Sequence, residues 1–200
     1  MNNSVTEMID AVFDVSGDII PPIYPFALWD ALVHHVPALA EDMLTGVIPL
    51  RTSSSEAGML LPKRSKLVLR LSQSLAADFT QLSGQSLDIG SCKLQLGSGK
   101  LRKIQDYPTL HAHLVTSDKD EVEFLQDVTA RLTELGIKGH LLCGMRNSLV
   151  ATDRTIHGYS LVIHDLKPED SLRLQYAGLA AYRRYGCGIF IPYKVITDLN

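Results

Sequence analysis

Alternating apolar and polar positions predict a strand at the start of the chain, and helical spacing predicts a helix after it. The stretch IDAVFDVSGDII (9–20) alternates from Ile9 and predicts a strand that ends at Gly17. Three prolines follow at 21, 22 and 25, and they predict an extended loop because proline restricts its own backbone and that of the residue before it. The stretch FALWDALVHHVPALAEDM (26–43) then carries leucines at helical spacing, which predicts an amphipathic helix with one buried face.

The rest of the first half continues with strands around a second helix. We expect short strands in GVIPLRT (46–52) and GMLL (58–61), and a stronger strand in SKLVLRLS (65–72). A helix in SLAADFTQLSG (74–84) and a strand pair in QSLDIGSCKLQLGSG (85–99) complete this half. The order strand, helix, strands, helix, strand is typical of a ferredoxin-like unit.

The second half repeats this order. Its expected strands are 109–117, 158–166 and 186–192, and its expected helices are 118–136 and 168–184. Asp118 and Glu121 have capping-box spacing at the first helix, and Pro168 falls in the first turn of the second. We therefore predict an α+β chain of tandem ferredoxin-like (βαββαβ) units, residues 1–104 and 105–200, joined near residues 103–108.

Length, charge and cysteine content narrow the class of protein. The 200 residues allow one large domain or two small ones. The net charge of −3 argues against a surface coated in basic residues, so a polyanion would have to meet a local patch. The three cysteines lack C-x-x-C spacing, which indicates a reducing compartment. Without an apolar run of about 20 residues or a visible signal peptide, we predict a cytoplasmic protein with no membrane partner.

Two groups of basic residues are candidates for binding an anion. Arg183 and Arg184 stand directly beside Gly186 and Gly188, and glycines permit a sharp turn and the close approach of a ligand. The alternative is a helix C-terminus that is stabilised by cations and capped by glycine. The second group, Lys63, Arg64 and Lys66, lies between two predicted strands, where it either contacts phosphates or forms a solvated hairpin tip.

Several stretches, in order along nearly the whole chain, resemble one protein family. They are IPPIYPFALWDAL, GVIPLRT, LLPKRSKLVLRL, LDIGSCKLQLG and, most specifically, EDSLRLQYAGLAAYRRYGCGIFIP. Together they resemble the Cas-six repeat-processing endoribonucleases of the RAMP superfamily, most closely the small Myxan-type subfamily. The resemblance implies tandem ferredoxin-like units with a glycine-rich turn before the last strand.

The resemblance also implies an activity. CRISPR repeat RNA (pre-crRNA) would be cleaved without a metal or another cofactor, by attack of a ribose 2′-hydroxyl on the adjacent phosphate. The products would be a 2′,3′-cyclic phosphate and a 5′-hydroxyl. The implied partners are the repeat RNA hairpin, which the protein would retain as crRNA, and other Cas subunits of a Cascade-like effector complex. The RNA-binding residues would be Lys63, Arg64, Lys66, Arg183, Arg184, Gly186 and Gly188.

The chain departs from the family pattern at the expected catalytic position. Tyr24 stands where the pattern has a histidine, and a tyrosine pKa of about 10 makes it a poor general base near neutrality. His34 and His35 follow ten residues later, so the catalytic candidates are His34, His35 and Tyr24. His35 lies near the apolar helix face, which leaves His34 the freer of the two to titrate.

Other interpretations remain open. Ala180 and Ala181 replace family glycines, and the pair His111 and His113 has no third metal ligand at recognisable spacing, so no metal site is predicted. A non-catalytic repeat-RNA binder would keep the fold and the basic patch but lack cleavage. A ferredoxin-like interaction protein with no RNA role would fit the acidic net charge.

Overall fold

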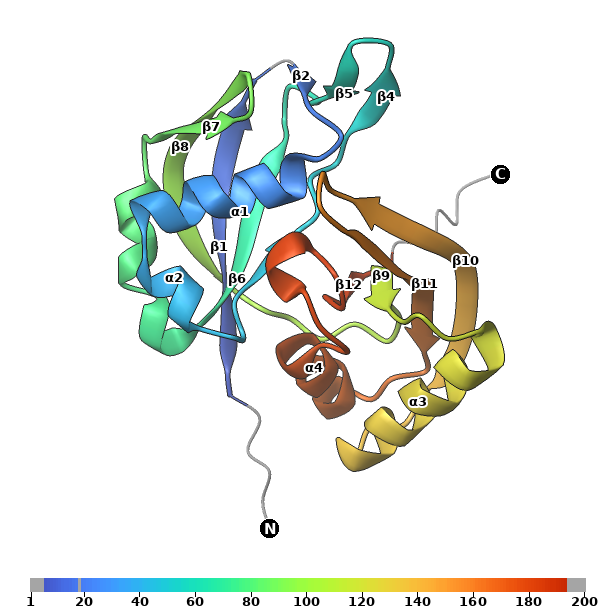
Figure 1. The fold of residues 1–200 in the computed structure, drawn as a ribbon. Coiled ribbons are helices and arrows are strands. Elements are labelled where there is room, and N and C mark those ends of the chain that lie inside the picture. Colours follow the sequence, from blue (N-terminus) through green and yellow to red (C-terminus); the bar gives the residue numbers. More distant parts are fainter. Residues whose placement is uncertain (1–5, 18, 194–200) are drawn as a thin grey trace, which may run out of the picture.

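Two antiparallel sheets, one in each half of the chain, form the frame of the molecule (Figure 1). The computed structural model describes residues 6–17 and 19–193. The predicted units begin at residue 1 and end at residue 200, and their outer residues 1–5 and 194–200, like Asp18, lie outside the described residues. The first sheet ends at Lys103 and the second begins at Leu110, on either side of the expected joint.

The first sheet has the strand order β3-β6-β1-β8-β7. Its strands are β1 (Met8–Ser16), β3 (Gly46–Ile48), β6 (Lys66–Ser72), β7 (Ser86–Ile89) and β8 (Cys92–Lys103). With β7 set aside as an added edge strand, the order is that of a βαββαβ unit, because β1 lies between the third and fourth strands of the repeat. The expected ferredoxin-like fold is therefore confirmed in this half.

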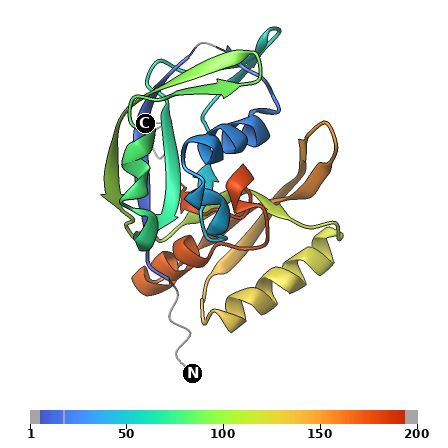
Figure 2. The same cartoon turned by 60° about the vertical axis from the view of Figure 1, so that its left-hand side comes forward.

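Helices cover one face of this sheet. Alternation along β1 and β6 sends Phe13 and Leu67, which are register partners, into the core beneath helix α1 (Tyr24–His35). Trp29 packs in the same core. Figures 1 and 2 show α1 and the short α2 (Ala38–Glu41) lying against this face of the sheet.

Two helix predictions in the first half were wrong. The single helix expected over 26–43 is divided. Helix α1 ends at His35 because Pro37 disfavours a helical conformation at Val36, the residue before it, and α2 begins only at Ala38. The helix expected over 74–84 is instead two 3₁₀ turns, η1 (Gln73–Leu75) and η2 (Asp78–Leu82). There the Thr80 hydroxyl donates to the carbonyl of Ala77, a local bond of the kind that competes with a regular helix.

A second unit with the same order follows. Its elements are β9 (Leu110–Thr116), α3 (Glu121–Glu134), β10 (His140–Val150), β11 (Thr155–His164), α4 (Pro168–Ala177) and β12 (Ile191–Pro192). The sheet order β10-β11-β9-β12 again matches a βαββαβ unit. Helices α3 and α4 lie side by side over one face of this sheet (Figures 1 and 2).

Sequence patterns placed several boundaries of this unit incorrectly. Strand β10 was not expected, because most of its side chains are exposed and their apolar positions do not alternate clearly. Helix α4 ends at Ala177 rather than near Arg184, since Gly178 adopts a positive φ of 62° and caps it. The N-cap of α3 is Asp120, which accepts from the Glu123 amide, so the box expected from Asp118 and Glu121 lies two residues too early.

Smaller elements complete the fold. A third sheet consists of β2 (Ile19–Ile20), β5 (Gly58–Leu60) and β4 (Ser53–Ser55), and a 3₁₀ turn, η3 (Arg183–Tyr185), follows α4. The final strand, expected over 186–192, is only the two residues of β12. Among the described residues, no helix is both long enough and apolar enough to cross a membrane.

Candidate functional site

A groove of about 680 Å³ opens between the two sheets, on the face of the first sheet that is turned away from α1. Asp10 and Arg70 line it, whereas their neighbours Ala11 and Leu69 pack in the core beneath the helix. We call this cavity the basic groove because six cationic side chains line it. They are Arg51, Arg64, Lys66, Arg70, Arg102 and Lys103.

The floor of the basic groove is a buried ion pair. Arg70 is 1% exposed, and its Nε donates to Asp10 Oδ1 at 2.9 Å. Its Nη1 donates to the carbonyl oxygens of Phe190 (2.7 Å) and Gln175 (3.2 Å) in the second unit. Arg102 adds a contact to Asp10 Oδ2 at 3.1 Å. Arg70 therefore joins the two units, and its charge is matched by Asp10 rather than offered to a ligand.

The rim of the basic groove carries cations that can contact a ligand. Arg51, Arg64 and Lys103 are exposed and form no salt bridge with any carboxylate that the structure describes. Lys66 is also exposed and pairs with Asp14. Such cations, converging from separate elements on one cavity, are suited to contact successive phosphates.

The structure separates the members of the basic cluster that was predicted between two strands, Lys63, Arg64 and Lys66. Arg64 and Lys66 line the basic groove, whereas Lys63 is exposed and is not among the lining residues. The sequence showed that these residues share a hairpin. Their meeting with Arg51, Arg102 and Lys103 depends on the sheet order, which no local pattern gives.

A histidine that was considered only as a metal ligand also lines the basic groove. His113 projects from β9 with an exposed edge, and the burial of the rest of its ring, followed by the charge of Arg51, lowers its pKa. The same causes, together with His113, lower the pKa of His111 to about 4. His113 is therefore neutral at pH 7, with a ring nitrogen able to accept a proton.

Arg183, predicted to contact RNA, is instead buried at the end of α4. Its Nη1 donates to the carbonyl oxygens of Tyr176 (2.9 Å) and Ala177 (2.5 Å). Burial, followed by the nearby charge of Arg70, lowers its pKa to about 10. In this packing Arg183 satisfies the last carbonyls of a helix, which is the alternative that the sequence left open.

Gly186 and Gly188 are likewise occupied by the protein's own packing. Gly188 has a φ of 65°, and a Cβ there would overlap the carbonyl oxygen of Leu179. Gly186 has a φ of 88°, and its Cβ would lie 2.8 Å from Cγ of Pro49. Because Pro49 lines the basic groove, the glycine-rich turn supports one wall of that groove from behind.

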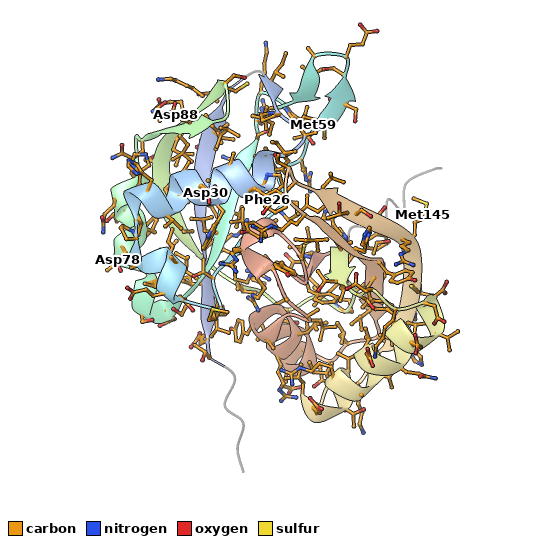
Figure 3. The ribbon with its side chains drawn as sticks, in the orientation of Figure 1. Phe26, Asp30, Met59, Asp78, Asp88 and Met145 are labelled. Carbon is orange, nitrogen blue, oxygen red and sulfur yellow. The ribbon has the colours of Figure 1, made fainter. Side chains whose placement is uncertain are left out.

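Arg184 is the exposed member of the arginine pair, and it lies among aromatic rings on the α1 side. Its guanidinium carbon is 5.4 Å from the ring centre of Tyr185. That ring lies 4.5 Å from Phe26 and 6.2 Å from the exposed Tyr182. We call Phe26, Tyr182, Arg184 and Tyr185 the aromatic patch. Figure 3 shows Phe26 at the end of α1 nearest to η3.

The three catalytic candidates lie outside the lining of the basic groove, although Tyr24 bonds to Leu50, between the lining residues Pro49 and Arg51. Tyr24 is buried, its hydroxyl accepts from the Leu50 amide at 3.1 Å, and burial raises its pKa. His34 is exposed and His35 half-buried, as the helical wheel indicated. Both stand near the other end of α1 from Phe26, and His34 lies about 12 Å from it along the axis, since eight residues rise about 1.5 Å each. None of the three lines the basic groove.

Comparison with known proteins settles the family. The model of a family described as "Cas6 Crispr" matches residues 9–195. A CRISPR-associated endonuclease Cas6 from Myxococcus xanthus (strain DK1622) is 33% identical over 186 residues, which are 92% of this chain and 81% of the relative. This chain belongs to the Cas6 family. The resemblance stated from the sequence is thereby confirmed.

Solved structures place the fold among Cas6 and RAMP proteins. A CRISPR-associated protein Cas6 superposes with a TM-score of 0.68 at 8% identity, covering 94% of this chain and all of the other. A RAMP protein described as binding different RNA substrates gives 0.68 at 12% identity, covering 91% of this chain and 98% of the other. At such identities the likeness shows a shared fold. The tandem ferredoxin-like architecture is therefore a Cas6 architecture.

Proposed function

We propose that this Cas6-family chain binds CRISPR repeat RNA in the basic groove and cleaves it as an endoribonuclease. The observation that carries the proposal is the set of exposed cations around a single cavity, Arg51, Arg64 and Lys103, which have no acidic partner among the described residues. With a net charge of −3, the chain concentrates positive potential there rather than over its surface. Its relative from Myxococcus xanthus is named an endonuclease, which supports the same activity here.

The basic groove would hold the RNA through its backbone. The deep groove of an A-form helix hides its bases, so phosphates and shape are what exposed arginines and lysines read. The aromatic patch provides a second contact, in which Tyr182 would stack on a base and Arg184 would pair with a phosphate. An RNA reaching both surfaces would pass around the β3 segment that separates them.

We propose a metal-independent cleavage. A ribose 2′-hydroxyl loses its proton to a base and attacks the adjacent phosphate, and the 5′-oxygen leaves with a proton from an acid. A 2′,3′-cyclic phosphate and a 5′-hydroxyl result, and a neighbouring cation stabilises the crowded phosphate. The candidate proton carriers are His34, His35 and Tyr24. His113 joins them because it is neutral at pH 7 and lies beside the cations of the basic groove.

The test is cleavage of labelled repeat RNA by purified protein in EDTA. The proposal predicts a cyclic-phosphate product, and none from RNA with a 2′-deoxy nucleotide at the cleaved position. The variants His34→Ala, His35→Ala, Tyr24→Phe and His113→Asn, assayed singly, assign the proton carrier as the one whose loss lowers the rate about 100-fold or more. If the wild-type protein cleaves and all four variants keep its rate, these site assignments are overturned while the activity stands.

A non-catalytic repeat-RNA binder is the second candidate, and a specific observation favours it. Tyr24 replaces the expected histidine and is engaged with Leu50, and His34 and His35 lie outside the basic groove. Tight binding that weakens with salt, without any cleavage, would establish this alternative.

We also propose that the protein stays bound to its product in the cytoplasm as a subunit of a Cascade-like complex. Retention predicts one turnover per protein molecule and co-elution of the cleaved RNA with the protein. Rapid multiple turnover would contradict retention without affecting the cleavage proposal.

A further inference from the structure

Two histidines and an aspartate meet where β10 begins and β11 ends. His140 and His164 are register partners on the two strands, and their rings stack with centroids 5.3 Å apart. Their neighbours Leu141 and Ile163 pack toward the second core, so both imidazoles project from the opposite, open face of the sheet. Asp165 follows His164 directly.

The Asp165 carboxylate lies between the two imidazoles. Its Oδ2 is 3.0 Å from Nδ1 of His140 and 2.8 Å from Nδ1 of His164. One ligand atom from each of the three residues lies within 4.8 Å of the others.

The backbone holds these residues in place from both sides. Gly139 allows β10 to begin close against β11, because a Cβ there would lie 2.8 Å from Cγ2 of Ile163. Asp165 adopts a left-handed φ of 59°, and the next amide, of Leu166, donates to the carbonyl of Pro108 at 3.0 Å. The backbone therefore fixes the positions of His140, at the start of β10, and of Asp165, in the turn after β11.

We propose that His140, His164 and Asp165 bind a divalent transition-metal ion, with Zn²⁺ the best match. Two imidazole nitrogens and one carboxylate oxygen are a donor set typical of zinc, whereas calcium and magnesium prefer oxygen alone. Tetrahedral bonds of about 2.0–2.1 Å place ligand atoms about 3.3–3.4 Å apart. The two separations between Asp165 Oδ2 and the imidazole Nδ1 atoms, 2.8 and 3.0 Å, would open by about 0.3–0.6 Å as the ion replaces the shared protons. The two imidazole nitrogens, which lie within 4.8 Å of each other, would move to the same spacing. Water fills the fourth position.

Such an ion would connect the start of β10 to the turn between β11 and α4. It is independent of the proposed RNA cleavage, which uses no metal. Strand β10, which supplies His140, was not predicted, so the pairing of His140 with His164 could not be anticipated from the sequence.

The test is a titration of tag-free, chelator-stripped protein with Zn²⁺ in competition with a chromophoric chelator. The proposal predicts one saturable site per chain. The variants His140→Asn, His164→Asn and Asp165→Asn should each weaken binding about tenfold or more. Asparagine tolerates a left-handed backbone, so Asp165→Asn keeps the turn. The control is His157→Asn, on the same strand, where His157 pairs with Ser148 instead.

Thermal unfolding gives a second readout of the same site. At a Zn²⁺ concentration that just saturates the wild-type site, the ion should raise the Tm of the wild-type protein and of His157→Asn, and should raise the Tm of Asp165→Asn much less. Absence of a saturable site in the wild-type protein would overturn the proposal. So would binding that survives Asp165→Asn and His164→Asn, or that is lost equally in His157→Asn.

Discussion

The basic groove and the glycine-rich turn are built from overlapping sets of residue types, yet they differ in what those residues face. In the basic groove, Arg51 and Arg64 are exposed and converge on a cavity. In the turn, Arg183 is buried against the end of α4, and Gly188 touches the backbone of Leu179. The first arrangement turns its donors toward the cavity, and the second buries the Arg183 guanidinium inside the fold, where its Nη1 donates to helix carbonyls.

The difference teaches that an arginine beside a glycine is not by itself a sign of anion binding. A helix C-terminus presents unsatisfied carbonyl oxygens, and a guanidinium satisfies them as well as it satisfies a phosphate. Which of the two it meets depends on burial, which the local sequence does not give. Arg183 is buried against helix carbonyls, whereas Arg184, its neighbour in the chain, is exposed.

The largest effect is expected when the turn itself is broken. Gly188→Ala should lower the free energy of unfolding by more than about 4 kcal/mol, because the new Cβ overlaps Leu179 and the φ is positive. Urea unfolding measures the loss. Gly84→Ala is the matched control, since its φ is 75° but nothing lies within 4 Å of the Cβ, and it should cost only about 1–2 kcal/mol. Equal losses in the two variants would contradict the packing account.

A smaller loss is expected at the floor of the basic groove. Arg70→Met should cost about 3 kcal/mol, because it leaves Asp10 buried with only the partly exposed Arg102 as a partner. The double variant Asp10→Asn/Arg70→Met removes the stranded charge and should recover a good part of that loss. Urea unfolding of the single and the double variant measures both the loss and the recovery of the free energy of unfolding. A single variant as stable as the wild type would show that the pair does not join the units.

The smallest effect is a pH dependence of the free energy of unfolding, which arises from His111 on the open face beside the basic groove. The pKa of His111 is about 4 in the folded chain and about 6.5 when unfolded, so only the unfolded state takes up this proton between those values. Stability should therefore fall as the pH drops from 6.5 to 4. We expect His111 to contribute about 1–2 kcal/mol of that fall, less than a fully buried ring would, because solvent reaches it.

Comparing urea unfolding at pH 7 and pH 4.5 isolates this contribution. His111→Asn should flatten the pH dependence relative to the wild type. An unchanged slope in the variant would show that another group titrates in this range.

The fold was predictable to a large extent because its strands and long helices carry clear periodicity. Strands β1 and β6 and helix α3 follow from alternation and from helical spacing. The errors include the edge strand β10, whose side chains are mostly exposed, and helix α4, which ends at its glycine cap, Gly178, seven residues before the expected boundary. Family membership was also visible, because the motif before the last strand is specific.

The candidate site was less predictable, for a physical reason. Arg64 and Lys66 were recognised as basic, but Arg102 and His113 join them only through the pairing of β1 with β8 and the packing of one unit on the other. Likewise, the burial of Arg183 and Tyr24 follows from packing rather than from the residues beside them. The sequence gives the types of the candidate residues, while the sheet order gives their neighbours.

The most direct test of the central claim is the salt dependence of repeat-RNA binding, measured by fluorescence anisotropy. The account predicts that Arg51→Gln/Arg64→Gln/Lys103→Gln lowers affinity strongly and reduces the slope of log K against log salt by about 2–3. Arg131→Gln, an exposed arginine on α3, and Arg183→Met, altered in the buried turn, should bind as the wild type does. Wild-type affinity and slope in the triple variant, with binding lost in Arg183→Met, would contradict it.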